Sequence, residues 1–301
     1  MYEQTAIGVV VPAHNEAEFV GDVIDSVPSF VDRLYVVDDC STDGTWTEIL
    51  EHADGAEAER VSAGAGSPDG AAGGVRRADG GVDVSLTPEG PGSFERTVVP
   101  VRHSVNRGRG GAVKTGYQLA LVEGLDVVAT MDGDGQMDAD ILDRIVDPVA
   151  NGDADYAKGN RLVDRDHCSA MSNWRLFGNV VLTLLTKVAS GYYGMRDPQN
   201  GYTAISVETL HDIDVGSLYN DYGFLNDVLI RLRASGKQIV DVPMRAVYED
   251  EESGIQYRSF VPSLSALLAR MFCWRLWVSY GPGERDGSST PPTDVGASGR
   301  K

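Results

Sequence analysis

Residues 127–136 read VVATMDGDGQ and contain the pattern that decides the fold. The apolar run at 127–131 predicts a strand, and Asp132 and Asp134 follow it in a turn that the neighbouring glycines permit. Two such carboxylates project from one edge and suit Mg²⁺ or Mn²⁺, which completes its coordination with phosphate oxygens and water. An EF-hand is excluded because no Glu stands at the twelfth loop position. We therefore predict a divalent metal on both aspartates, with a plain acidic turn as the alternative.

The same succession of strand and polar turn recurs along the chain. Runs rich in β-branched residues lie at 6–11, 33–37 and 98–101, and helix-like segments lie at 110–122 and 139–150. Strands that alternate with helices predict an α/β fold with a mostly parallel sheet flanked by helices. In such a sheet, ligands bind beyond the carboxyl ends of the strands, so the polar turns form the candidate site.

The turn after the second predicted strand offers two carboxylates. Residues 37–45 read VDDCSTDGT, and Asp38 and Asp39 stand where the strand ends. Their oxygens could accept hydrogen bonds from the N–H of a base or from ribose hydroxyls. A simpler reading is local, because Thr42 or Asp43 can cap the next helix.

The turn after the third predicted strand opens a helix. Residues 106–114 read NRGRGGAVK. Glycines, free N–H groups at the start of a helix, two arginines and a lysine make an anion site there. A dinucleotide fingerprint does not fit, because its last glycine position, counted from Gly108, is Val113. We predict that this loop binds a diphosphate.

Two stretches break the alternation. Residues 53–96 are rich in Gly, Ala, Ser, Asp and Pro without periodicity, which predicts a flexible surface insertion; a catalytic lid is the alternative. Residues 284–301 predict a disordered tail. Further helices are predicted at 172–189, 224–234 and 259–280, and further strands at 202–206 and 238–242.

The charge balance excludes one class of partner. The 301 residues include 45 Asp and Glu against 26 Lys and Arg, a formal net charge of −19. Such a surface repels phosphates, so nucleic acid is not expected as a partner. The composition is typical of halophilic archaea, whose salt screens the repulsion between carboxylates. Three cysteines without disulfide or metal spacing fit a reducing cytosol, and neither a signal peptide nor a spanning helix is expected.

Three long stretches of this acidic chain contain no Asp or Glu: 96–122, 167–196 and 253–283. The first contains the predicted diphosphate-binding loop at 106–114, which we call the anion loop. The other two carry bases and tryptophans, among them Arg270 and Arg275, and predict amphipathic helices that meet a lipid phosphate or a membrane surface. The alternative is that buried helices hold few charges.

Taken together and in order, the motifs resemble those of the inverting family 2 glycosyltransferases. They are PAHNE at 12–16, DDxSxDGT at 38–45, NxGxGxA at 106–112, DGDxQ at 132–136, GNR at 159–161, DPQNG at 197–201 and VP at 242–243. Within this family the chain is most similar to the branch of dolichol-phosphate mannose synthases and dolichol-phosphate glucosyltransferases, archaeal members included. The similarity spans most of residues 6–260.

The resemblance implies a GT-A fold for residues 1–250, and the acid-free stretch predicts an amphipathic, membrane-associating helical segment at 251–283 after it. The implied catalytic residues are Asp132, Asp134, Gln136 and Arg161. The implied nucleotide-binding residues are Pro12, His14, Asn15, Glu16, Asp38, Asp39, Asn106, Gly108, Lys114 and Asp132. The implied acceptor-binding residues are Arg175, Asp197, Asn200 and Arg258, and the implied metal is Mg²⁺ or Mn²⁺ on Asp132 and Asp134.

Two positions depart from the family pattern. His14 stands where a tyrosine is frequent. Residues 248–258, YEDEESGIQYR, replace the basic pattern that these synthases often carry after the VP strand. Arg258 is therefore the substitute candidate for the acceptor phosphate.

The resemblance implies hexose transfer from a nucleoside diphosphate sugar to dolichyl phosphate in protein N-glycosylation, at the inner face of the cell membrane. Likeness to archaeal enzymes favours a UDP-hexose over GDP-mannose. A phosphate acceptor is already ionised near neutral pH, because its second pKa is about 6. A sugar hydroxyl acceptor would need a general base, for which Asp227 is the candidate.

Two other classes of protein fit less well. A non-catalytic sugar-nucleotide-binding protein should show a broken metal motif, and this motif is intact. A glycosidase would leave the diphosphate-type loop unexplained. The sequence carries no signal of the oligomeric state.

Overall fold

The computed structural model describes residues 2, 5–53, 61–63, 97–161, 173–221, 223–244 and 257–280; at 61–63, 173–181, 257–263 and 280 it describes the backbone alone. One eight-stranded sheet has the order β3-β4-β2-β1-β5-β7-β6-β8. The strands are β1 (Ile7–Ala13), β2 (Arg33–Asp38), β3 (Val61–Ala63), β4 (Thr97–His103), β5 (Val127–Thr130), β6 (Tyr156–Asn160), β7 (Thr203–Ser206) and β8 (Ile239–Pro243). Every neighbouring pair is parallel except those that β7 makes with β5 and β6. The predicted α/β fold with a mostly parallel sheet is confirmed.

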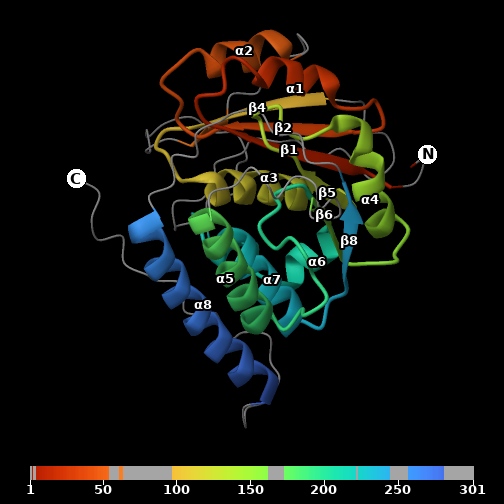
Figure 1. The fold of residues 1–301 in the computed structure, drawn as a ribbon. Coiled ribbons are helices and arrows are strands. Elements are labelled where there is room, and N and C mark those ends of the chain that lie inside the picture. Colours follow the sequence, from red (N-terminus) through yellow and green to blue (C-terminus); the bar gives the residue numbers. More distant parts are fainter. Residues whose placement is uncertain are drawn as a thin grey trace, which may run out of the picture.

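Helices cover both faces of the sheet (Figure 1). One face carries α1 (Val20–Ser26), α2 (Thr45–His52), the short turn η1 (Ala139–Ile141) and α4 (Leu142–Ala150). The other carries α3 (Arg109–Glu123), α6 (Val207–Asp212), the turn η3 (Val215–Ser217) and α7 (Phe224–Ala234). A further layer of α5 (Asn173–Ser190) and α8 (Tyr257–Tyr280) packs on α7.

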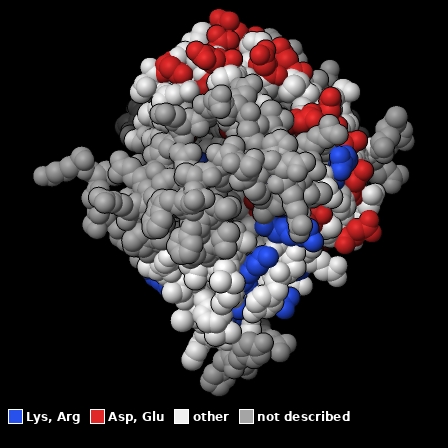
Figure 2. Space-filling view, in the orientation of Figure 1, with Lys and Arg blue, Asp and Glu red and all other residues white. Residues whose placement is uncertain are grey.

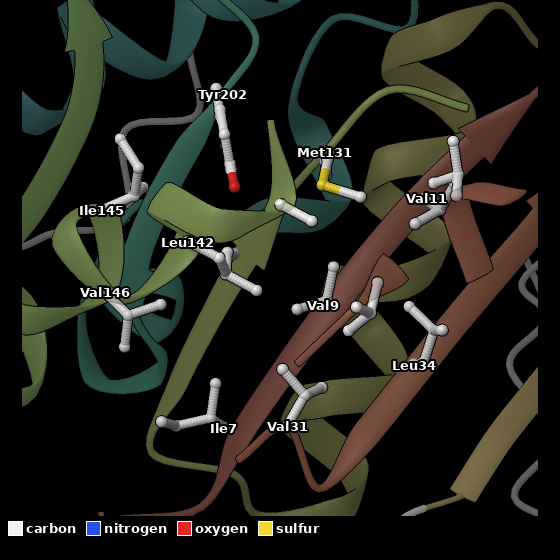
Figure 3. Close-up of a cluster of buried hydrophobic side chains, with 14 of the residues drawn as sticks. Ile7, Val9, Val11, Val31, Leu34, Met131, Leu142, Ile145, Val146 and Tyr202 are labelled. Atoms are coloured by element: carbon white, nitrogen blue, oxygen red, sulfur yellow. The ribbon is translucent and has the colours of Figure 1, made fainter. Parts of the chain in front are cut away.

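The apolar runs of the sequence form strands that are buried on both faces. All seven residues of β1 are buried. Val9 and Val11 point into the cluster under α1 and α4, where Figure 3 shows them with Leu34 and Leu142. Val10 points into the opposite cluster, under α3. Continuous rather than alternating apolar residues are what a parallel sheet covered on both sides requires.

Helix α8 forms where the sequence predicts the C-terminal amphipathic helix, and one of its faces packs on the protein. Leu264, Leu267, Leu268 and Met271 follow helical spacing and are buried against Ile230 of α7 and the end of α5. The apolar stripe of α8 therefore packs on the protein itself. No helix in the described part of the chain is long and apolar enough to cross a membrane.

Three elements escaped the sequence prediction. Residues 61–63 form β3, which pairs in parallel with β4, although they lie inside the predicted insertion. The rest of that insertion at 54–60 and 64–96, and the predicted tail at 284–301, lie outside the described residues. Strand β6 reads YAKGN, and α6 is only six residues long, so neither carries a clear apolar period.

The packing of α3 on β1 gives a testable prediction about Gly116. A Cβ atom there would lie 2.4 Å from Cγ2 and 2.5 Å from Cγ1 of Val10. We expect Gly116→Ala to lower the free energy of unfolding by about 1–3 kcal/mol, despite the better helix propensity of alanine. Gly44→Ala is the control, since its Cβ would meet only Ala17, at 3.6 Å. Urea unfolding of both variants decides, and an unchanged Gly116→Ala midpoint contradicts the close packing.

Candidate active site

The motifs meet at one edge of the sheet. Strands β1, β2, β4 and β5 run in parallel, and the register pairs Ala13 with Asp38 and Asp38 with Arg102. The turns that follow these strands therefore lie side by side, as expected for a site at the carboxyl ends. Pro12 of β1 accepts a hydrogen bond from Gly133 N at 3.2 Å, which links the first motif to the metal motif.

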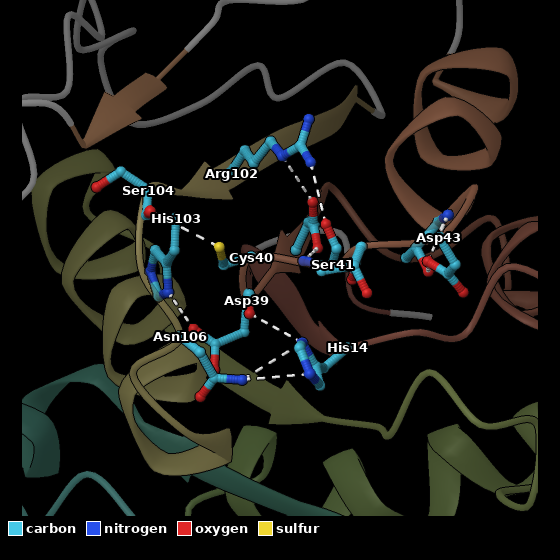
Figure 4. Close-up of polar contacts among 12 residues, drawn as sticks. His14, Asp39, Cys40, Ser41, Asp43, Arg102, His103, Ser104 and Asn106 are labelled. Atoms are coloured by element: carbon cyan, nitrogen blue, oxygen red, sulfur yellow. Dashed lines mark hydrogen bonds and ion pairs between the residues drawn. The ribbon is translucent and has the colours of Figure 1, made fainter. Parts of the chain in front are cut away.

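Asp39 is buried at this edge, where it lies beside His103 and His14 (Figure 4), and it binds the loop that opens α3. Its Oδ1 accepts a hydrogen bond from Arg107 N at 2.8 Å, and its Oδ2 accepts one from Gly108 N at 2.7 Å. The His103 Nδ1 atom lies 2.7 Å from Oδ1, and His103 Nε2 lies 2.9 Å from the Thr115 hydroxyl. The sequence predicts Asp39 as a nucleoside ligand, but its described contacts hold the loop.

The exposed rim of the edge consists of His14, Asn15 and Asn106. His14 Nδ1 lies 2.9 Å from the Asp39 carbonyl oxygen, and the Asn106 amide nitrogen lies 3.3 Å from His14 Nε2. Asn15 has a positive φ of 60°, and its side chain accepts a hydrogen bond from Thr42 N at 2.9 Å. These side chains cross-link three turns and leave polar groups at the surface, where a base or a ribose can bind.

The remaining predicted nucleotide residues support the second turn. Asp38 is buried, accepts a hydrogen bond from Ser41 N at 2.8 Å and pairs with Arg102 Nε at 3.0 Å. Glu16 N donates to the Thr45 hydroxyl at 2.8 Å. Asp38 therefore shapes the turn from inside.

Asp132 of the metal motif binds a residue of the anion loop. Arg109, the first residue of α3, directs both Nε and a terminal guanidinium nitrogen at Asp132 Oδ1, at 2.7 and 2.6 Å. The loop is thus held at both ends, by Asp39 through its amides and by Asp132 through Arg109. Neither this pair nor His103 was singled out from the sequence, because their partners lie in other turns.

The second aspartate of the motif shapes its own turn. Asp134 accepts a hydrogen bond from Gln136 N at 3.0 Å, and Gly135 has a positive φ of 73°. Among the described residues, no group of three or more His, Cys, Asp or Glu could hold a metal ion. Two carboxylates nevertheless fit Mg²⁺ or Mn²⁺, because these ions commonly take one or two carboxylates and obtain the rest from phosphates and water. Asp132 and Asp134 would hold the ion.

The loop at 197–201 lies against the metal motif. A Cβ atom on Gly201 would lie 3.0 Å from Asp132 Oδ2. Asp197 pairs with Arg161 Nε at 2.8 Å, and its carbonyl oxygen accepts a hydrogen bond from the buried Lys158. The predicted residues Arg161 and Asp197 are therefore paired with each other, and Asp197 begins the loop whose Gly201 lies against Asp132.

Asn200 does not match its predicted role as an acceptor ligand. Its side chain is buried, donates to Met244 Sδ at 3.1 Å and accepts a hydrogen bond from Tyr202 N at 3.0 Å. It therefore stabilises the loop. The side chains of the other two predicted acceptor ligands, Arg175 and Arg258, lie outside the described part of the structure.

Lys114 also departs from its predicted role at the nucleotide. Its ammonium donates to the carbonyl oxygens of Gly216 and Leu218 and to Asn220 Oδ1, at 2.8–2.9 Å. Burial lowers the pKa of this ammonium to about 8. All three donors are used within the protein, so Lys114 ties α3 to the segment before α7.

Asp227 is unsuited to act as a general base. It is fully buried in α7, pairs with Arg231 Nε at 2.8 Å and accepts a hydrogen bond from Tyr219 N at 2.9 Å. Burial raises the pKa of this carboxyl, against the effect of Arg231. A substrate hydroxyl has no route to a carboxylate placed in this way, so the structure contradicts the alternative in which Asp227 activates a sugar hydroxyl.

Known proteins resemble this chain in sequence. The family model described as glycosyl transferase family 2 matches residues 8–77 and 93–211. The UDP-N-acetylglucosamine–dolichyl-phosphate N-acetylglucosaminyltransferase of Methanococcus voltae is 24% identical over 245 residues, 81% of this chain and 86% of that protein. The polyprenol monophosphomannose synthase of Mycolicibacterium smegmatis is 28% identical over 260 residues, 83% of this chain and 80% of that protein.

The fold also has a counterpart among solved structures. The glucosyl-3-phosphoglycerate synthase of Mycobacterium tuberculosis, crystallised with Mn²⁺, UDP and glucosyl-3-phosphoglycerate, matches with a TM-score of 0.55 at 18% identity. The match covers 90% of this chain and 80% of that one, and at this identity it shows the shared GT-A fold alone. The match to the family model covers more than half of the chain and therefore assigns the family as well as the fold. The protein belongs to glycosyl transferase family 2 and is an enzyme of the glycosyltransferase class.

Proposed function

We propose that the protein transfers a hexose from a nucleoside diphosphate sugar to a polyprenyl phosphate, with inversion at the anomeric carbon and with Mg²⁺ or Mn²⁺. A UDP-hexose is the favoured donor, dolichyl phosphate the acceptor and protein N-glycosylation the process. The relatives support this acceptor, because one is named for transfer to dolichyl phosphate and another for a polyprenol product.

The observation that carries the proposal is the double attachment of the anion loop. Asp39 fixes the backbone of Arg107 and Gly108, while Arg109 lies against Asp132. Amides at the start of α3, a guanidinium and a carboxylate pair that suits a metal are therefore next to one another. A nucleoside diphosphate needs this combination, since its phosphates bind both helix N-termini and a divalent cation.

The chemistry needs little from the protein beyond placement and charge. An oxygen of the acceptor phosphate attacks the anomeric carbon, and the bond from that carbon to the diphosphate breaks. The acceptor is already ionised near neutral pH, because its second pKa is about 6, so the burial of Asp227 is no obstacle. The cation, when bound, supplies counter-charge to the leaving diphosphate. Arg161, held by Asp197, is the residue that we propose to orient the reacting groups.

The direct test is transfer of labelled sugar from UDP-sugars to dolichyl phosphate with Mn²⁺, followed by organic extraction. We expect label in the organic phase for wild type and a loss of at least about 100-fold for Asp132→Asn and Asp134→Asn, the scale of one lost electrostatic stabiliser. The exposed Asp153→Asn is the control. Full activity of either variant, or of wild type in excess EDTA, contradicts the metal assignment.

The membrane contact lies at the far end of α5 and α8. Six large apolar side chains there are 36–70% exposed: Leu184, Leu185, Val188, Tyr193, Leu276 and Trp277. Neither helix contains Asp or Glu, and Arg275 links them by donating to the Val188 carbonyl oxygen at 3.3 Å. In Figure 2, the described acidic side chains gather at the end that carries α1 and α2 and along one flank, whereas most of the visible Lys and Arg side chains lie on the lower half. An apolar patch with positive charge suits an anionic membrane surface at the inner face of the cell membrane.

Vesicle binding tests this surface. Leu184→Glu combined with Trp277→Glu should weaken binding to anionic vesicles by about tenfold or more, because burying one such side chain is worth about 1.5–3 kcal/mol. The matched control is Val122→Glu, since Val122 is 57% exposed on α3 and lies outside the patch. Sedimentation with phosphatidylglycerol vesicles measures both. Equal binding of the double variant and the control contradicts the surface.

A further inference from the structure

Arg109 is part of the proposed diphosphate site, yet its guanidinium is bound to Asp132 of the metal motif. It follows directly on the amides that Asp39 fixes, and its guanidinium gives two nitrogen atoms to one oxygen of Asp132, at 2.7 and 2.6 Å. Contacts of a guanidinium with a carboxylate are short and strong compared with neutral hydrogen bonds. Asp132 therefore already has a counter-charge in the absence of a metal.

The surroundings of Arg109 are shaped for this contact. The Gly201 carbonyl oxygen lies 3.5 Å from the guanidinium nitrogen that also binds Asp132. A Cβ atom on Gly201 would lie 2.1 Å from that same nitrogen, so a larger residue there would push the guanidinium out of its present position. The pair is still open to solvent, with 31% of the Arg109 and 23% of the Asp132 side chain exposed. A ligand can reach both partners from outside.

A divalent cation and Arg109 compete for Asp132. Both are positive, and a cation on Asp132 would lie beside the guanidinium and be repelled by it. A diphosphate removes this conflict, because a guanidinium binds phosphate oxygens as readily as carboxylate oxygens. Arg109 can turn from Asp132 to the phosphates without leaving the start of α3.

We infer that Arg109 is a positioning residue that holds Asp132 until a nucleoside diphosphate takes over its guanidinium, so that metal and nucleotide bind together and metal alone binds weakly. The inference rests on the proposed metal and nucleotide sites. The coupling is reciprocal, since a ligand that helps the metal to bind must itself be helped by the metal to the same extent.

Titration with Mn²⁺ alone, followed by the electron paramagnetic resonance of the free ion, tests the inference without any activity. Arg109→Gln should bind Mn²⁺ at least about tenfold more tightly than wild type, the scale of one charge-assisted pair. A variant that only damaged the site would bind more weakly. The control is Arg102→Gln, which also removes one positive charge from this edge of the sheet. Arg102 pairs with Asp38, at 3.0 Å, and not with Asp132, so this variant should bind Mn²⁺ as wild type does. Equal Mn²⁺ affinity of Arg109→Gln and wild type overturns the inference.

Nucleotide binding gives a second, independent reading. In wild type, UDP should raise Mn²⁺ affinity at least about tenfold, and this coupling should be weaker in Arg109→Gln, where only the direct contact of the phosphates with the ion remains. If Arg109→Gln does not fold, Arg109→Lys replaces it, and its Mn²⁺ affinity should lie between those expected for wild type and Arg109→Gln. If UDP and Mn²⁺ bind independently in wild type, the inference fails while transfer activity can stand. If wild type transfers no sugar, yet Arg109→Gln binds Mn²⁺ more tightly, the proposed function fails and the competition stands.

Discussion

The hydrogen bonds that Asp39 makes with the start of α3 are the constraint on which the rest of the site depends. A buried carboxylate is costly unless its oxygens are bonded, and here two backbone amides and His103 bond them. The same bonds fix the direction of the amides that open α3. The burial of Asp39 and the order of the anion loop therefore depend on each other, and losing these hydrogen bonds would disturb both.

This loop joins parts of the chain that are far apart in sequence. Its backbone amides donate to Asp39, which follows β2, and its Arg109 pairs with Asp132, which follows β5. Gly108 and Gly110 lie close to Asn220 before α7, because a Cβ atom on either glycine would lie within 3 Å of the Asn220 carbonyl oxygen. The loop at 197–201 meets the same point through Gly201. A change at any of these contacts would alter the proposed nucleotide and metal sites together.

The sequence predicted the parts of the molecule that local patterns control. Apolar runs gave β1, β2, β4 and β5, and the polar turns after them form the edge where the site lies. Strand β6 was missed because it contains Lys158, whose burial depends on the Asp197 carbonyl oxygen from a distant turn. Lys114 and Asp227 were misread for the same reason, since their partners, Leu218 and Tyr219 among them, come from remote or irregular chain. The spacing of residues along the sequence indicates which side chains face a site, but it does not show which neighbours form hydrogen bonds with them.

Calorimetric binding of UDP with Mg²⁺ to the Asp39→Asn variant tests most directly whether this carboxylate organises the diphosphate site. An amide cannot accept from both loop amides and His103 as the carboxylate does. With the fold retained by circular dichroism, UDP affinity should fall by at least about tenfold, the scale of the charge-assisted bonds that are lost. Asp43→Asn, on the outer part of the same turn, should bind as wild type does. Unchanged affinity in Asp39→Asn would contradict the dependence of the site on Asp39.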